Sequence, residues 1–253
     1  MGITAVIPAR LDSTRYPRKP LRKILGMPMV EHVYRRTQMS EMVDETYVAT
    51  PDAEIRDVVE GFGGGAIMTG THIRGTERVA EAAESIEAEF ILKVHTDEPL
   101  IHPDMLDKAI KKVVENDDIR VANVARPIHG KDEYQNPNNI KVVTDESGNA
   151  LYFSRSPIPY LHDSQFDSAR INHQICVAPI ERNLLLEYKS LDEGTLESIE
   201  SIDMLRFLEH GYNISVVRTD RKTQSVDTPE ERDRAAKLME EDELVNEYIS
   251  HAD

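Results

Sequence analysis

The stretch that decides the fold is Ile7-Pro8-Ala9-Arg10-Leu11-Asp12-Ser13-Thr14-Arg15-Tyr16-Pro17-Arg18-Lys19-Pro20-Leu21-Arg22-Lys23. It continues an apolar run, residues 3–7, that is typical of a buried first strand. Positions 10 to 23 carry six basic side chains, although the formal net charge of the 253-residue chain is -16. Prolines at positions 8, 17 and 20 favour a loop that is held in one shape.

Cations at the carboxyl end of the first strand of an α/β sheet lie where such sheets bind their ligands. An acidic protein that gathers cations at this point is expected to bind a polyanion, and a nucleoside triphosphate is the first candidate. The alternative interpretation is a solvated basic loop without a ligand.

Length and composition indicate one globular domain over residues 1–253, with 40% hydrophobic and 30% charged residues. No apolar stretch is long enough to span a bilayer and no signal peptide is present, so we expect a cytoplasmic protein without a membrane partner. The single cysteine, Cys176, excludes an intramolecular disulfide and is interpreted as a small buried apolar residue. The negative charge disfavours a nucleic acid as partner.

Strand-like and helix-like segments alternate after the basic loop. Helices are expected at residues 28–40, 52–62, 76–86 and 103–116, and strands at 46–50, 66–68, 90–94 and 120–125. The glycines at 61 and 63–65 follow a helix, which predicts a turn and not a dinucleotide-binding fingerprint. The alternation predicts a three-layer α/β fold with a mostly parallel, doubly wound sheet.

The pattern changes at about residue 126. Residues 140–144 and 150–154 flank a turn sequence and predict a β-hairpin. Residues 126–180 are therefore expected to form a small β-rich excursion within the single domain. The later segments are a strand at 173–180, a helix at 197–210, a strand at 212–218, a helix at 229–240 and a loosely packed acidic tail at 240–253.

Two aspartates are candidate metal ligands. Asp97 directly follows the strand 90–94, at the edge of the sheet where the basic loop is also expected. Asp227 precedes a helix start. Mg²⁺ commonly takes one or two protein carboxylates together with substrate phosphates. The alternatives are a turn residue for Asp97 and a helix cap or first-turn acid for Asp227.

Seven blocks of the chain resemble, in order and approximate spacing, the 3-deoxy-manno-octulosonate (Kdo) cytidylyltransferase family, the CMP-Kdo synthetases. The blocks are Ile7-Pro8-Ala9-Arg10, Ser13-Thr14-Arg15, Lys19-Pro20-Leu21, Gly75-Thr76-Glu77-Arg78, Asp97-Glu98-Pro99, Leu151-Tyr152-Phe153-Ser154-Arg155 and Val226-Asp227-Thr228-Pro229. The resemblance implies a nucleotide-diphospho-sugar transferase fold and a homodimer, with the excursion at 126–180 on the acceptor and dimerisation side. It also implies transfer of CMP from CTP to the anomeric hydroxyl of a sugar acid, with Mg²⁺ and release of pyrophosphate.

The same resemblance implies roles for individual residues. The catalytic residues would be Lys19, Arg10 and Asp97, with Mg²⁺ held by Asp97 and Asp227. Nucleotide-binding positions would be Arg10, Ser13, Arg15, Arg18, Lys19, Gly75, Thr76 and Arg78. Acceptor-binding positions would be His95, Arg155 and His173. For Arg155 a structural salt bridge at the hairpin is the alternative to a bidentate pair with the acceptor carboxylate.

The chain also departs from the family pattern. Arg18 replaces a glycine, which either alters the loop or adds a phosphate contact. His95-Thr96 replaces a Gln-Gly pair, and after His173 the family strand is largely lost. The chain is therefore interpreted as a divergent member. Its acceptor is expected to be Kdo, or a related anion such as an amino-Kdo, a nonulosonic acid or a phosphonate. The remaining alternative is a nucleotide-binding homologue without catalysis.

Overall fold

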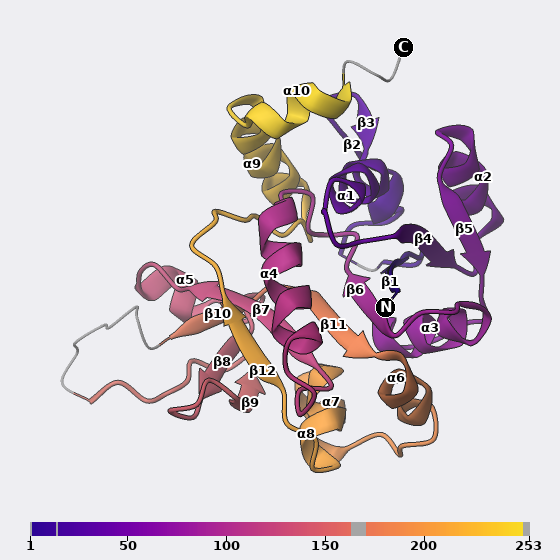
Figure 1. Cartoon of the computed structure of the whole chain (residues 1–253). Coiled ribbons are helices and arrows are strands. Elements are labelled where there is room, and N and C mark those ends of the chain that lie inside the picture. Colours follow the sequence, from indigo (N-terminus) through magenta and orange to yellow (C-terminus); the bar gives the residue numbers. More distant parts are fainter. Residues whose placement is uncertain (1, 14, 163–170, 250–253) are drawn as a thin grey trace.

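The computed structural model describes residues 2–13, 15–162 and 171–249. The described residues form two five-stranded sheets and a small two-stranded one (Figure 1). The first sheet has the order β11-β6-β1-β4-β5, and its central strands run parallel. Only β11 is antiparallel to its neighbour β6. Its strands are β1 (Ile3–Pro8), β4 (Glu45–Thr50), β5 (Gly65–Met68), β6 (Phe90–Val94) and β11 (Val177–Glu181).

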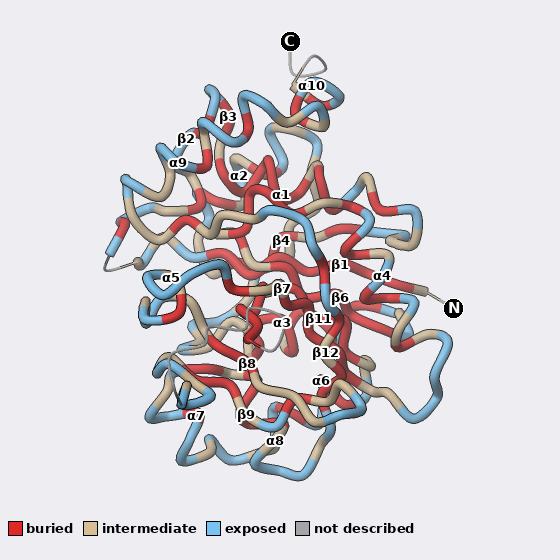
Figure 2. The backbone as a smooth tube through the Cα atoms, turned by 90° about the vertical axis from the view of Figure 1, so that its left-hand side faces the viewer, coloured by how far each residue is buried: buried red, intermediate tan, exposed pale blue. Residues whose placement is uncertain are grey.

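Helices cover both faces of this sheet, because alternate side chains of each strand point to opposite sides. Ile3, Ala5 and Ile7 pack with one group of helices, and Val6 packs with the other. The first group is α1 (Met29–Gln38), α2 (Ala53–Gly61) and α4 (Pro103–Val114), and the second is α3 (Gly75–Ala82) and α6 (Arg182–Tyr188). Figure 2 shows the strands buried at the centre and the exposed residues on the outer helices and loops. The predicted three-layer, mostly parallel α/β fold is confirmed.

The second sheet, of order β12-β7-β10-β8-β9, lies beside the first. The hairpin of β8 and β9 confirms the expected one, with Gly148 at φ 85 in its turn. The other elements here are β7 (Ala122–Pro127), α5 (Lys131–Gln135), β8 (Lys141–Thr144), β9 (Ala150–Ser154), β10 (Asn172–Gln174) and β12 (Ser215–Arg218). Of the expected excursion at 126–180, residues 163–170 lie outside the described part of the chain.

The prediction of a single strand at 173–180 is wrong. The chain forms β10 and β11 instead, in different sheets, with Ile175 and Cys176 between them. Gln174 is still paired with Ala125, whereas Val177 already pairs with Val94. This crossing connects the two sheets next to the carboxyl end of β6.

The single helix expected at 197–210 is also wrong, because it divides into α7 (Thr195–Glu200) and α8 (Met204–Glu209). Ser201 takes φ 55, a left-handed conformation that ends α7. The Arg155 guanidinium donates to the carbonyl oxygens of Glu200, at 2.7 Å, and Ser201, at 3.3 Å. These carbonyl groups therefore have partners outside a continuous helix.

The acidic tail beyond residue 240 packs more closely than expected. After α9 (Pro229–Glu240), residues Glu243–Ile249 form α10, whose Val245 and Tyr248 are buried. Helices α9 and α10 lie beside α1 and the small hairpin of β2 (Lys23–Ile24) and β3 (Met27–Pro28) (Figure 1). None of the helices in the described ranges has the length and apolar character required to cross a membrane.

Candidate functional site

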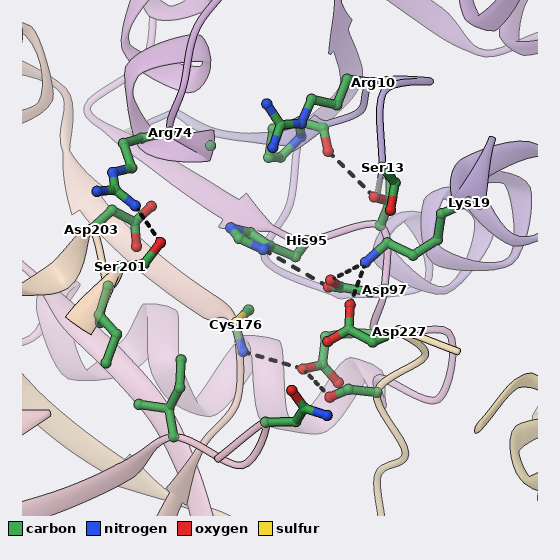
Figure 3. A pocket seen from close by; sticks show the side chains of 18 of the residues that line it. Arg10, Ser13, Lys19, Arg74, His95, Asp97, Cys176, Ser201, Asp203 and Asp227 are labelled. Atoms are coloured by element: carbon green, nitrogen blue, oxygen red, sulfur yellow. Dashed lines mark hydrogen bonds and ion pairs between the residues drawn. The ribbon is translucent and has the colours of Figure 1, made fainter. Parts of the chain in front are cut away.

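A cleft of about 390 Å³ opens at the carboxyl ends of β1 and β6, where the two large sheets meet. Its wall includes residues of the basic loop, of the segments after β6 and β9, and of the segment before α9 (Figure 3). Eleven positions singled out from the sequence line it: Arg10, Ser13, Arg15, Lys19, Gly75, Arg78, His95, Asp97, Arg155, His173 and Asp227. The expected convergence of the basic loop with both aspartates is confirmed.

Backbone contacts hold the basic loop in place. The Ala9 N–H donates to the carbonyl oxygen of Ala49, at 2.9 Å, and the Arg18 N–H closes the loop onto that of Leu11, at 3.1 Å. The side chain of Asp52, the residue before α2, accepts the Leu11 N–H at 2.9 Å and makes no hydrogen bond to the start of the helix. The loop then enters a short 3-10 helix, η1 (Lys19–Leu21), which places Lys19 at the cleft.

Lys19 forms the centre of the site. Its Nζ lies 2.7 Å from Asp97 Oδ2 and 2.9 Å from Asp227 Oδ1, and Arg15 is 2.9 Å from the other Asp227 oxygen. Burial alone would lower the pKa of Lys19, but the two carboxylates reverse this and raise it. Burial would likewise raise the pKa of Asp97, yet the Lys19 charge keeps it below its usual value. Both groups are therefore ionised at neutral pH.

The two aspartates come from distant parts of the chain and are held together by their backbones. The Val226 N–H donates to the Asp97 carbonyl oxygen at 2.9 Å. Asp227 itself lies just before α9, whose cap is Thr228 with Glu231 in a capping box. The helix-cap interpretation thus applies to Thr228, and the Asp227 carboxylate points to Lys19 (Figure 3).

Glu98 and Cys176 are cleft residues that the sequence interpretation missed. The Glu98 Oε1 accepts from the Ser225 hydroxyl at 2.8 Å and from the Cys176 N–H at 3.4 Å, so this carboxyl ties three segments together behind Asp97. Burial and the charge of Asp97 raise the pKa of Glu98 to about 8. Cys176, expected in the apolar core, lines the cleft. Its only sequence signal was its position next to the disrupted strand.

Two expected nucleotide-binding side chains lie outside the cleft lining. Arg18 turns its guanidinium toward Glu54 on α2 and forms an ion pair there. Thr76 is fully buried, and its hydroxyl is engaged by Lys93 and Asp203. Lys93 and Asp203, which hold the Thr76 hydroxyl, themselves line the cleft, and neither was singled out from the sequence.

The expected acceptor residues His95, Arg155 and His173 all line the cleft. His95 lies between Asp97 and Asp203 (Figure 3), with its Nδ1 3.8 Å from Asp97 Oδ1. Burial, followed by the Lys93 charge, lowers the pKa of His95. The Arg155 guanidinium donates to the backbone carbonyl oxygens of Pro137, Glu200 and Ser201. These contacts are structural, but among the described residues they do not include the salt bridge expected as the alternative. His173 is nearly buried, and burial together with Arg126 lowers its pKa to about 3.

The donor set around Asp97 fits a magnesium ion that shares its coordination with phosphate oxygens. Asp97 Oδ1 is buried without a hydrogen-bond partner among the described residues, as an oxygen available for a cation would be. Asp97 and Asp227 supply the hard carboxylate oxygens that Mg²⁺ prefers. Over residues 2–13, 15–162 and 171–249, no cluster of three or more acidic, histidine or cysteine side chains suits a metal ion. A magnesium ion held by these two carboxylates would therefore take its other oxygen ligands from outside the described residues.

Comparison with known proteins agrees with this site. A family model described as "Cytidylyltransferase" matches residues 4–223. A 3-deoxy-manno-octulosonate cytidylyltransferase of Syntrophotalea carbinolica is 43% identical, over 91% of this chain and 96% of that protein. One of Geobacter sulfurreducens is 42% identical, over 94% of this chain and 100% of that protein.

Solved structures give the same relationship. A CMP:2-keto-3-deoxy-manno-octonic acid synthetase complexed with CTP superposes with a TM-score of 0.88 at 35% identity, covering 95% of this chain and 99% of that one. A 4-diphosphocytidyl-2C-methyl-D-erythritol synthase of Anaerococcus prevotii shares the fold, with a TM-score of 0.65 at 14% identity, over 94% of this chain and 98% of that one. The chain belongs to the cytidylyltransferase family, among the 3-deoxy-manno-octulosonate cytidylyltransferases.

Proposed function

We propose that this protein transfers CMP from CTP to the anomeric hydroxyl of Kdo and releases pyrophosphate. The observation that carries the proposal is the meeting of Lys19, Asp97 and Asp227 at the carboxyl ends of β1 and β6. The CTP-bound relative, which superposes over nearly the whole chain, supports CTP as the nucleotide. Since CTP is a cytoplasmic nucleotide, we propose the cytoplasm as the compartment.

The cations of the cleft are suited to a triphosphate. Neither Arg10 nor Arg78 forms a salt bridge with another described residue, and burial together with the Arg10 charge lowers the pKa of Arg78. Such unpaired guanidinium groups gain charge-assisted hydrogen bonds when phosphate oxygens approach. Arg15 and Ser13 extend this basic wall toward Asp227.

In the proposed reaction the anomeric oxygen of Kdo attacks the α-phosphorus of CTP, and the bond from that phosphorus to the β-phosphate oxygen breaks. Negative charge grows on the α-phosphate oxygens and on the departing pyrophosphate. The Lys19 ammonium stabilises this charge, and the arginines orient the leaving group. Asp97 and Asp227 would hold Mg²⁺, which when bound would neutralise phosphate charge and help the attacking hydroxyl to lose its proton.

We further propose a homodimer. The β9 and α7 segments expose apolar side chains, of which Leu151 is 63% and Ile199 75% exposed. The two segments are neighbours, because Tyr152 and Ser154 of β9 both donate hydrogen bonds to Glu200 at the end of α7. Exposed apolar side chains of this size suit contact with a second copy of the chain.

A pyrophosphate-release assay tests the reaction. The purified chain is supplied with Mg²⁺, with CTP, UTP or GTP, and with Kdo, amino-Kdo, a nonulosonic acid or a neutral sugar phosphate. We expect release with CTP and an anionic 2-keto sugar, and its abolition by a metal chelator. Turnover of a neutral sugar phosphate with UTP or GTP, and none with CTP, would overturn the proposed function.

A further inference from the structure

Lys93 places an ammonium group inside the central sheet. It belongs to β6, whose other residues are apolar, and only 2% of Lys93 is exposed. A buried cation is costly unless it is paired and hydrogen-bonded. Lys93 also lines the cleft, so its partners determine the charge and the hydrogen-bonding groups that a ligand meets at this part of the wall.

The partners of Lys93 are Thr76 and Asp203. Lys93 Nζ donates to the Thr76 hydroxyl at 2.8 Å and lies 3.1 Å from Asp203 Oδ2. The same Asp203 oxygen accepts from the Thr76 N–H, at 3.2 Å, and from the Thr76 hydroxyl. The three contacts that reach the Asp203 carboxylate, one from Lys93 and two from Thr76, all end on Oδ2. Within the described part of the chain, Asp203 Oδ1 has no hydrogen-bond partner, and the Asp203 side chain, 14% exposed, lines the cleft.

The charge state of Asp203 follows from these contacts. Burial alone would raise its pKa, but the Lys93 ammonium and the hydrogen bonds from Thr76 and Lys93 bring it below its usual value. Asp203 is therefore a carboxylate at neutral pH, with one oxygen fixed and the other available as an acceptor. Because Lys93 balances its charge, the pair as a whole is neutral.

The pair belongs to the end of the cleft remote from Lys19. In Figure 3, His95 separates Asp203 from Asp97 and Lys19. Arg155 donates to the carbonyl oxygen of Ser201, two residues before Asp203 in the chain. A ligand that reacts near Asp97 and extends along His95 would present a polar group to Asp203 Oδ1.

We infer that Lys93 and Asp203 form a charge-balanced acceptor subsite, in which Lys93 weakens the attraction of Asp203 for an ammonium group and so favours an acid that bears a hydroxyl at this point. This inference rests on the proposed function. A hydroxyl donates to Oδ1 without adding charge. An ammonium group would also contact Oδ1, but Lys93 already balances the charge of Asp203, so a second cation gains less there than beside an unbalanced carboxylate. Lys93 acts through Asp203 and is a positioning residue.

The test compares kcat/KM for Kdo and for amino-Kdo at saturating CTP, in the wild type and in Lys93→Met. The ratio of the two values in the wild type is the reference. Lys93→Met leaves Asp203 unbalanced, so the preference should move toward amino-Kdo by about tenfold, the scale of a relieved like-charge contact. The KM for CTP should stay within about twofold, since the CTP cations lie elsewhere. Lys93→Arg, which keeps the charge, should keep the wild-type ratio.

Two further variants make the comparison decisive. Lys111→Met, on the exposed side of α4, is the matched control and should not alter the preference. Lys93→Met/Asp203→Asn removes both charges and serves if Lys93→Met does not fold. It should bind both acceptors weakly and distinguish little between them.

An unchanged preference in a folded Lys93→Met or in the double variant would overturn the inference while leaving the proposed function intact. The same holds if Lys93→Arg shifts the preference as far as Lys93→Met does. A wild type that releases no pyrophosphate with either acceptor would overturn the proposed function itself.

Discussion

Lys19 carries the largest share of the proposed chemistry at the scale of single residues. Its ammonium is the shared counter-charge of Asp97 and Asp227, and it is only 13% exposed. Lys19→Ala should lower kcat by about a hundredfold or more, as loss of one preorganised donor does, and weaken CTP binding much less. Steady-state kinetics and calorimetric CTP titration measure the two effects. A loss of CTP affinity as large as the loss of kcat would contradict a transition-state role.

Arg18 has a different place in the structure. Its φ of 61 is the conformation that a glycine adopts readily, and its guanidinium contacts Glu54 at the surface. Arg18→Gly should therefore leave CTP affinity within about twofold. It should change the free energy of unfolding by less than about 1 kcal/mol, because relief of the left-handed backbone offsets the exposed ion pair. Calorimetry at two salt concentrations tests this, and clearly weaker binding in the variant would show that Arg18 reaches the phosphates.

A site residue could be predicted from the sequence where its chemical type suggests a role and its place just after a strand fixes its position in the fold. The basic loop follows β1 directly, and Asp97 directly follows β6, so the topology of the sheet brings them together. Lys93 and Asp203 could not be predicted in this way. The lysine occupies a strand that is otherwise apolar, and its partner is 110 positions away in the chain.

At the scale of elements, long periodic segments were predictable and the breaks between them were not. Helices α1, α2 and α4 agree with their apolar spacing. The division of the expected 197–210 helix depends on Ser201 and on hydrogen bonds from Arg155, a residue far away in sequence. The division into β10 and β11 likewise depends on pairing with two different sheets, since Gln174 pairs with β7 and Val177 pairs with β6. Tertiary contacts of this kind leave no local pattern.

The packing of α10 on α1 gives a prediction for pH. His32 on α1 is fully buried. Its Nε2 donates to the Ile24 carbonyl at 2.8 Å, and its Nδ1 accepts from the Tyr248 hydroxyl at 2.9 Å. Burial, and to a smaller extent the charges of Arg36 and Arg35, lower the pKa of His32 to about 4. His32 therefore becomes protonated at a lower pH in the folded state than in the unfolded state, where its pKa is about 6.5.

Stability should consequently fall as pH drops through the range from about 6.5 to 4. Between pH 7 and pH 5 the His32 contribution is a loss of about 2 kcal/mol in the free energy of unfolding. Urea unfolding of the wild type and of His32→Gln at both values isolates it. We expect a smaller pH dependence in the variant, and an equal dependence in both proteins would show that His32 is not responsible.

On the scale of the whole molecule, charge is distributed unevenly. The chain has a formal net charge of -16, yet the cleft gathers Arg10, Arg15, Lys19 and Arg78. A local positive region on an acidic molecule attracts a triphosphate and disfavours binding of anions over the rest of the surface. The fold provides the meeting point, since β1, β6 and the crossing from β10 to β11 all end there.

The exposed apolar face of β9 and α7 gives a prediction for the assembly. Ile199→Asp should convert the proposed dimer to a monomer, because a carboxylate in an apolar interface is desolvated without a partner. Analytical ultracentrifugation of the wild type and the variant measures the mass. Leu238→Asp, on the outer side of α9, is the matched control and should leave the dimer intact. A wild type that sediments as a monomer at all concentrations tested would contradict the dimer.

The most direct test of the central claim is the turnover number for pyrophosphate release from CTP and Kdo in Asp97→Asn and Asp227→Asn, across a Mg²⁺ titration. Each variant should lose at least about a hundredfold in kcat, or about 2.7 kcal/mol of transition-state stabilisation, while Asp57→Asn on exposed α2 should match the wild type. Near wild-type turnover in either cleft variant would contradict the assignment of Lys19, Asp97 and Asp227 as one catalytic centre.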